Sequence, residues 1–152
     1  MNLVDELQRI VAALEAARIP YAVCGGIAVT IHGVVRTTKD IDLLVRRTDL
    51  ERVLEAIRPL GYKFVALPMT FEQGTPRERH LQRVTKIEGT DHLIIDLMLD
   101  EGALARFLAE SMRVELPSGP LRVVTREALV RMKRLANRSQ DRADLEKLDG
   151  GS

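Results

Sequence analysis

The spacing of hydrophobic residues changes several times along the chain, and each change predicts a new element of secondary structure. Apolar side chains recur every three or four residues near the start, which predicts a helix over residues 2–18. The polar stretch 70–80, which contains Gly74 and Pro76, predicts a mobile loop. Further helices are expected over 26–33, 48–60, 101–112, 125–137 and 139–148, and strands over 21–24, 40–45, 62–67, 81–88 and 92–99. This alternation predicts one continuous α/β unit that ends in two helices.

Length and composition indicate a single globular domain. The chain has 152 residues, of which 45% are hydrophobic and 30% charged, as in ordinary globular proteins. We expect one domain over residues 1–148 and a disordered tail over 149–152. The 23 basic and 22 acidic residues give a net charge of +1, which excludes a strongly basic nucleic-acid coat and an acidic disordered protein.

Cysteine content and hydropathy indicate the cellular compartment in which the protein is expected. Cys24 is the only cysteine, which excludes an internal disulfide framework and a zinc site built from several cysteines. No apolar run approaches the roughly 18 residues of a membrane-spanning helix, and the acidic, amphipathic N-terminus is unlike a signal peptide. We therefore expect a cytoplasmic protein without a membrane partner.

Two acidic residues stand at the start of the predicted strand 40–45. Asp40 and Asp42 are two positions apart, so on a strand their side chains point to the same face. Neighbouring carboxylates repel, and a divalent cation relieves that repulsion. Mg²⁺ or Mn²⁺ suits such a site, with phosphate oxygens as the remaining ligands. The alternative is a solvated strand end that carries two unrelated acids.

A third acid lies inside an apolar run. Asp96 is the only polar residue of the segment 93–99, and such a run is typical of a central strand covered on both faces. A buried, unpaired carboxylate is costly, so Asp96 requires a partner. A metal ion shared with Asp40 and Asp42 is one solution. Asp96 could instead lie at an open sheet edge or pair with a distant arginine.

A pair of glycines separates the first predicted strand from the helix 26–33. Gly25 and Gly26 would let the backbone approach a phosphate closely, although a plain turn explains them equally. Thirteen residues separate Gly26 from Asp40. Phosphates on the glycine turn could then share metal ions with Asp40 and Asp42.

This combination resembles the signature of the polymerase-β-like nucleotidyltransferase superfamily, which pairs a Gly-Gly or Gly-Ser turn with an acid–apolar–acid motif about a dozen residues later. Asp96 fits the place of the third acid. Two further features resemble the AbiEii/AbiGii type, which includes toxins of bacterial toxin–antitoxin and phage-defence systems. These are the R-x-T-x-D-x-D motif that begins at Arg36 and a tail with Lys133, Arg138 and Asp141.

The resemblance covers about residues 20–148 and implies a mixed β-sheet flanked by helices. It implies that Asp40, Asp42 and Asp96 hold two metal ions and that Asp96 accepts the proton of the attacking hydroxyl. Position 26 is glycine where some relatives have a phosphate-binding serine, and Thr30, Thr37 and Thr38 are candidates to replace it. The implied nucleotide-binding residues are Gly25, Gly26, Arg36, Thr38 and Arg138, and Lys133 and Asp141 complete the catalytic set.

The function expected from this resemblance is transfer of a nucleoside monophosphate from a nucleoside triphosphate to an acceptor hydroxyl, with release of pyrophosphate. The acceptor could be tRNA, a protein or a small molecule, and an antitoxin could be a partner chain. One alternative is a catalytically idle nucleotide-binding module that acts through a partner chain, and another is a metal-dependent phosphohydrolase. A surface ion-pair ladder is the alternative for Lys133 and Asp141, and a structural or exposed role is expected for His32, His80 and His92.

Overall fold

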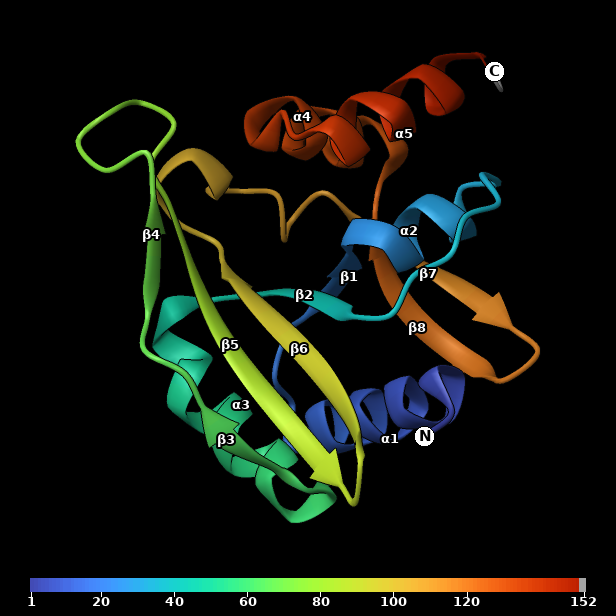
Figure 1. Cartoon of the computed structure of the whole chain (residues 1–152), viewed down its shortest axis with the longest axis vertical. Helices are drawn as coiled ribbons and strands as arrows, with labels where there is room; N and C mark the ends of the chain where they lie inside the picture. Colours follow the sequence, from blue (N-terminus) through green and yellow to red (C-terminus); the bar gives the residue numbers. More distant parts are fainter. Residues whose placement is uncertain (151–152) are drawn as a thin grey trace.

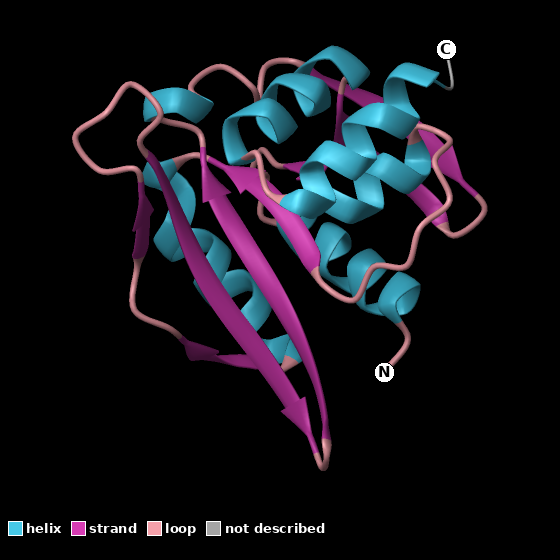
Figure 2. Ribbon diagram, turned by 45° about the horizontal axis from the view of Figure 1, so that its top comes forward, coloured by secondary structure: helices cyan, strands magenta, loops and turns pink. Residues whose placement is uncertain are grey.

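The strands of the protein form one twisted mixed sheet, seen in a computed structural model that describes residues 1–150 (Figures 1 and 2). The strands are β1 (Ala22–Cys24), β2 (Ile41–Val45), β3 (Tyr62–Val65), β4 (Met69–Phe71), β5 (Arg79–Glu88), β6 (Asp91–Leu99), β7 (Ser111–Leu116) and β8 (Gly119–Val124). Their order is β3-β5-β6-β2-β1-β8-β7, and β4 pairs with β5 beside β3. The helices are α1 (Leu3–Ala16), α2 (Gly25–Ile31), α3 (Leu50–Ile57), α4 (Arg126–Ala136) and α5 (Ser139–Gly150), and 3₁₀ turns cover Arg47–Asp49, Arg58–Leu60 and Gly102–Leu104.

The centre of the sheet holds its parallel pairs. β2 runs parallel to β6, and β1 runs parallel to β8, whereas the other neighbours are antiparallel. Ile41, Leu43, Ile95 and Leu97 are fully buried, as expected for central strands covered on both faces. The mixed sheet with flanking helices confirms the predicted fold class.

Helices α1 and α3 pack beside each other against one face of the sheet, away from α4 and α5 (Figure 1). The side chain of Asn2 begins α1 by accepting a hydrogen bond from the Asp5 amide at 3.1 Å. The apolar side chains Leu7, Ile10 and Leu14 of α1 are buried at the spacing that predicted this helix. The expected helix over 48–60 is divided, because 3₁₀ turns flank α3 on both sides.

The two closing helices form a hairpin at the end of the sheet where α2 lies (Figure 1). Thr125 caps α4 by accepting a hydrogen bond from the Ala128 amide, and Asn137 ends the helix in a left-handed conformation at φ 49°. Helix α5 extends through Gly150, so residues 149 and 150 are helical where a disordered tail was expected. The rest of that predicted tail, 151–152, lies outside the described residues.

The expected helix over 101–112 is wrong. Only the 3₁₀ turn Gly102–Leu104 forms there, and β7 already begins at Ser111. Leu104 and Phe107 are both buried, so successive turns of an irregular chain reproduce a helical spacing of apolar residues. The positive φ of 76° at Arg106 is incompatible with a right-handed helix.

The polar stretch 70–80 contains a shorter loop than expected. Its start belongs to β4 and its end to β5, so a loop over 72–78 connects the two strands. None of the helices within residues 1–150 is long and apolar enough to cross a membrane.

Candidate active site

Two carboxylates lie side by side at the centre of the sheet. β2 and β6 are parallel, and their register places Asp42 directly beside Asp96. On the other side of β2, Cys24 at the end of β1 faces Asp42. Neighbouring strands are about 4.8 Å apart, so the two acids occupy one small area of the sheet surface. The pairing of two acids far apart in sequence is therefore correctly anticipated.

The glycine pair fits tightly around the strand that carries Asp42. Gly25 has a φ of +64°, and a Cβ atom there would lie 2.0 Å from Oδ2 of Asp42. A Cβ at Gly26 would lie 2.6 Å from Oγ1 of Thr38 and 3.3 Å from Cζ of Arg36. Both glycines are therefore required by close packing, and they face different surroundings.

The carboxylate of Asp42 holds its proton more firmly than an ordinary aspartate. Burial is the main cause that raises its pKa from 3.8 to about 6, and the nearby charges of Asp96 and Asp40 act in the same direction. The charges of Lys133 and Arg138 oppose this shift of the pKa. The negative charge around Asp42 is thus only partly offset, which favours binding of a cation or of a positively charged group.

Asp96 has a protein partner that the sequence prediction offered only as an alternative. Arg83, on the neighbouring strand β5, donates from Nε to Oδ1 at 2.8 Å and from Nη2 to Oδ2 at 3.0 Å. This arginine offsets the cost of burying Asp96, which is only 7% exposed. Burial of Asp96 alone therefore does not require a metal ion.

Asp40 lies apart from the other two acids. It precedes β2, and it lines a separate cavity of about 350 Å³ together with Thr38. Asp40 is close enough to influence the charge of Asp42, but it does not line the cavity above Asp42 and Asp96.

The main cavity has a volume of about 650 Å³ and opens above the paired acids. Six of the ten predicted site residues line it, and they are Gly25, Asp42, Asp96, Lys133, Arg138 and Asp141. The remaining four, Asp40, Gly26, Arg36 and Thr38, do not line it. Its apolar wall consists of Phe71, Leu81, Met98, Leu129, Met132 and Ala136.

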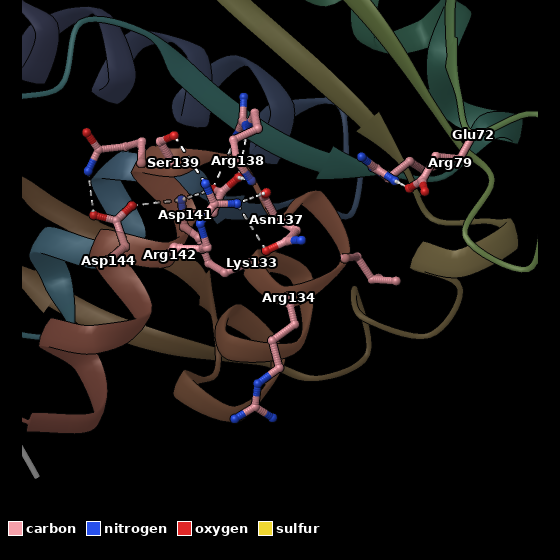
Figure 3. Close-up of polar contacts among 12 residues, drawn as sticks. Glu72, Arg79, Lys133, Arg134, Asn137, Arg138, Ser139, Asp141, Arg142 and Asp144 are labelled. Atoms are coloured by element: carbon pink, nitrogen blue, oxygen red, sulfur yellow. Dashed lines mark hydrogen bonds and ion pairs between the residues drawn. The ribbon is translucent and has the colours of Figure 1, made fainter.

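The tail residues form a buried ion-pair cluster between α4 and α5, shown in Figure 3. Nζ of Lys133 lies 3.0 Å from Oδ1 of Asp141 and 3.0 Å from Oδ2 of Asp144. Arg138 donates through its side chain to Asp141 at 2.7 Å, and Nη1 of Arg36 donates to Asp144 at 2.6 Å. The side chains of Lys133, Asp141 and Asp144 are buried, so the cluster is not a surface ladder. It is not one continuous helical face either, because Asn137 reverses the chain between its members.

These pairings change the roles expected for two basic residues. The resemblance implied nucleotide binding by Arg36 and a catalytic role for Lys133, yet both side chains are engaged by α5 carboxylates. Arg36 instead joins the segment between α2 and β2 to α5. Arg138 is different, because its side chain remains 75% exposed at the cavity while it contacts Asp141.

The family of the chain follows from its sequence match to known families. Residues 1–135 match the model of a family described as "Uncharacterised nucleotidyltransferase". The chain belongs to this family. It is thus a nucleotidyltransferase, as the resemblance had implied, and no curated protein matches it closely enough to refine the assignment.

Solved structures with the same fold include other nucleotidyltransferases. ANT(2")-Ia in complex with adenylyl-2"-tobramycin aligns with a TM-score of 0.61 at 16% identity, over 97% of this chain and 88% of that one. The lincosamide antibiotic adenylyltransferase LnuA, bound to lincomycin, gives 0.61 at 16% identity, over 95% of both chains. TM1012 from Thermotoga maritima, a candidate nucleotidyltransferase, gives 0.63 at 15% identity, over 96% and 91%.

The second wall of the nucleotidyltransferase cavity was missed by sequence reasoning. Glu72, which follows β4, accepts hydrogen bonds from Arg79 at 2.6 Å and from Arg77 at 3.2 Å, and all three line the cavity. Figure 3 shows this pair of Glu72 and Arg79 apart from the α4–α5 cluster. The polar composition of 70–80 indicated a loop, but it did not indicate that the loop would border the site.

The basic residues Arg79, Arg83 and Lys86 of β5 are divided between two faces of the sheet. Arg79 and Arg83 share one face of β5, whereas Lys86 points to the other and is buried against Glu6 at 2.8 Å. The Arg83–Asp96 contact did have a signal in the sequence. Gly89 and Thr90 form a two-residue hairpin loop between β5 and β6, and counting back from it places Arg83 opposite Asp96.

The histidines take the modest roles expected of them in two cases. His32 bonds to the backbone carbonyl of Val124 at 2.8 Å, and the His92 side chain is exposed. His80 lines the cavity and contacts Thr70 and Glu78. Within residues 1–150 it makes no hydrogen bond to Asp42 or Asp96.

A divalent cation suits the donor set at Asp42 and Asp96. Nucleotidyltransferases in general use a nucleoside triphosphate and divalent metal ions, and hard carboxylate oxygens on adjacent strands are suitable ligands. Within residues 1–150, no group of three or more His, Cys, Asp or Glu side chains is arranged to hold a metal ion. The protein can therefore supply two carboxylates, and Mg²⁺ commonly takes its other ligands from phosphates and water.

Proposed function

We propose that this nucleotidyltransferase transfers a nucleoside monophosphate from a nucleoside triphosphate to a hydroxyl group, with release of pyrophosphate, at the floor of the 650 Å³ cavity. The observation that carries the proposal is the register that pairs Asp42 with Asp96 beneath Gly25. Two adjacent carboxylates, beside a glycine that leaves the backbone open, provide the groups that phosphoryl chemistry needs.

The roles of the residues follow from their surroundings. Asp96 is held in place by two hydrogen bonds from Arg83 and can accept the proton of the attacking hydroxyl. Asp42 and Asp96 are the ligands for a divalent cation, with Asp40 as a neighbouring charge; the ion would stabilise the developing negative charge on the phosphate oxygens. Gly25 lets phosphates approach, and the exposed guanidinium of Arg138 can contact them.

The acceptor is a small hydroxyl-bearing molecule. A cavity of about 650 Å³ lies within the usual range for small-molecule sites. Its apolar wall can hold a base or a hydrophobic part of an acceptor. Two proteins of the same fold were solved with an adenylylated antibiotic or an antibiotic acceptor, which supports this choice over tRNA or a protein.

The narrower AbiEii/AbiGii kinship rests on the motif that begins at Arg36 and on the tail of Lys133, Arg138 and Asp141. Under this hypothesis the protein is the toxin of a pair, and an antitoxin binds it. Growth arrest on induced expression, absent from the Asp42→Asn variant, is the expected result. Normal growth with an active enzyme would remove the toxin role and leave the transferase proposal intact.

The activity is tested with each α-³²P-labelled nucleoside triphosphate, Mg²⁺ or Mn²⁺, and a cell lysate. We expect label in a small-molecule product and release of pyrophosphate. Asp42→Asn and Asp96→Asn should abolish both, whereas Asp91→Asn, on the exposed end of β6, should not. Release of free monophosphate would indicate a phosphohydrolase, and nucleotide binding without turnover would indicate the idle regulatory module; either result overturns the proposal.

A further inference from the structure

Of the paired acids Asp42 and Asp96, Asp96 forms an ion pair with Arg83, a residue that does not line the cavity. Arg83 lies on β5 directly opposite Asp96, and its Nε and Nη2 bind the two carboxylate oxygens at 2.8 and 3.0 Å. Arg83 itself does not line the cavity, whereas Asp96 does. Each carboxylate oxygen of Asp96 thus accepts one hydrogen bond from the guanidinium and keeps further lone pairs for another ligand.

The other basic groups near the site are already balanced. Lys133 lies between Asp141 and Asp144, and Arg138 contacts Asp141. Among the ion pairs within residues 1–150, Asp96 is the only partner of Arg83. Arg83 is thus the cation that forms an ion pair with the acids at the centre of the sheet, through Asp96.

The charge of Arg83 acts on Asp42 as well as on Asp96, because the strand register places the two acids side by side. Without this arginine, the two paired acids would have no ion-pair partner within residues 1–150. A divalent ion at Asp42 and Asp96 would lie within a few ångströms of the guanidinium, and two positive charges at that distance repel.

We propose that Arg83 is a positioning residue that fixes the carboxylate of Asp96 and supplies, in the metal-free enzyme, the positive charge that a divalent ion supplies during turnover. This inference rests on the proposed function. It implies opposite effects on two quantities: the charge of Arg83 weakens metal binding, and its two hydrogen bonds orient Asp96 for catalysis. A residue that merely maintained the fold would affect both in the same direction.

Two variants separate charge from orientation. Arg83→Gln removes the charge, so it should tighten Mn²⁺ binding in the absence of nucleotide by at least about tenfold, while kcat falls by about tenfold or more. Arg83→Lys keeps the charge but loses the two-point contact. It should therefore bind Mn²⁺ within about threefold of the wild type and still show the lower kcat.

The measurements are calorimetric titration of the nucleotide-free protein with Mn²⁺ and steady-state pyrophosphate release. Arg113→Gln serves as the matched control, because Arg113 pairs with Glu115 on β7 at the far edge of the sheet. Unchanged or weaker Mn²⁺ binding in Arg83→Gln, or an unchanged kcat in Arg83→Lys, would overturn the role of Arg83 alone. A wild-type protein that neither binds Mn²⁺ nor transfers nucleotide would overturn the proposed function as well.

Discussion

Replacement of Asp42 by asparagine should stabilise the metal-free protein while it abolishes transfer. Burial and the charges of Asp96 and Asp40 raise the pKa of Asp42 from 3.8 to about 6. A pKa difference of about 2 between the folded and unfolded states corresponds to about 3 kcal/mol of unfavourable free energy in the folded state once Asp42 is ionised. An asparagine side chain is neutral and nearly the same shape, so the Asp42→Asn variant should recover up to that amount at neutral pH.

The stabilisation by Asp42→Asn should depend on pH, because Asp42 destabilises the folded protein only when it is ionised. Between about pH 4 and pH 6 the folded protein binds the Asp42 proton more tightly than the unfolded chain does. The free energy of unfolding of the wild type therefore falls as pH rises through this window. The gain from Asp42→Asn should be small near pH 4 and should reach its full value above pH 7.

The assay is urea unfolding in EDTA at pH 4.5 and pH 8, followed by circular dichroism. Asp91→Asn is the matched control, because Asp91 is exposed and its pKa is lowered through its hydrogen bond to the N-terminal amine, so this variant should not stabilise the protein. An Asp42→Asn variant no more stable than the wild type at pH 8, or equally stabilised at both pH values, would refute the reasoning from charge repulsion.

Three further predictions concern packing and buried charge. Gly25→Ala places a Cβ 2.0 Å from Oδ2 of Asp42 at a φ of +64°, so it should lower pyrophosphate release by about a hundredfold and also lower the melting temperature. Lys133→Met leaves two buried carboxylates short of a partner and should cost about 3 kcal/mol in urea unfolding. Burial raises the pKa of Glu6, but the hydrogen bonds from Lys86 and Tyr62 lower it overall. The contribution of Glu6 to the free energy of unfolding is therefore present above about pH 4.5 and is lost as the pH falls. Glu6→Gln should destabilise the protein at pH 7 more than at pH 3. Equal effects of Glu6→Gln at both pH values would contradict this.

The sequence predicted the centre of the site because buried strands have a recognisable pattern. Asp42 and Asp96 interrupt apolar runs, and a metal ion shared between them was the reason to expect them close together. Gly25 was recognised as part of the turn before α2. Its specific contact with Asp42 could not be inferred, because that contact depends on the register of β1 against β2.

The tail shows why helical spacing alone was insufficient. The eight-residue separation of Lys133 and Asp141 would place them on one face of a continuous helix, yet the left-handed Asn137 places them on different helices that pack together. Partners such as Arg36 and Asp144, which are 108 positions apart, depend on the complete fold. The helix predicted over 101–112 is wrong for a different reason. There, an irregular segment buries apolar residues at a spacing that resembles that of a helix.

Helix α5 has a consequence for the electrostatics of the whole tail. The family match ends at residue 135, whereas the carboxylates that engage Lys133 and Arg36 come from α5, beyond that limit. These two cations therefore depend on the last helix for their counter-ions. Removal of α5 would leave this lysine and arginine without their carboxylate partners, as two cations able to bind an anion.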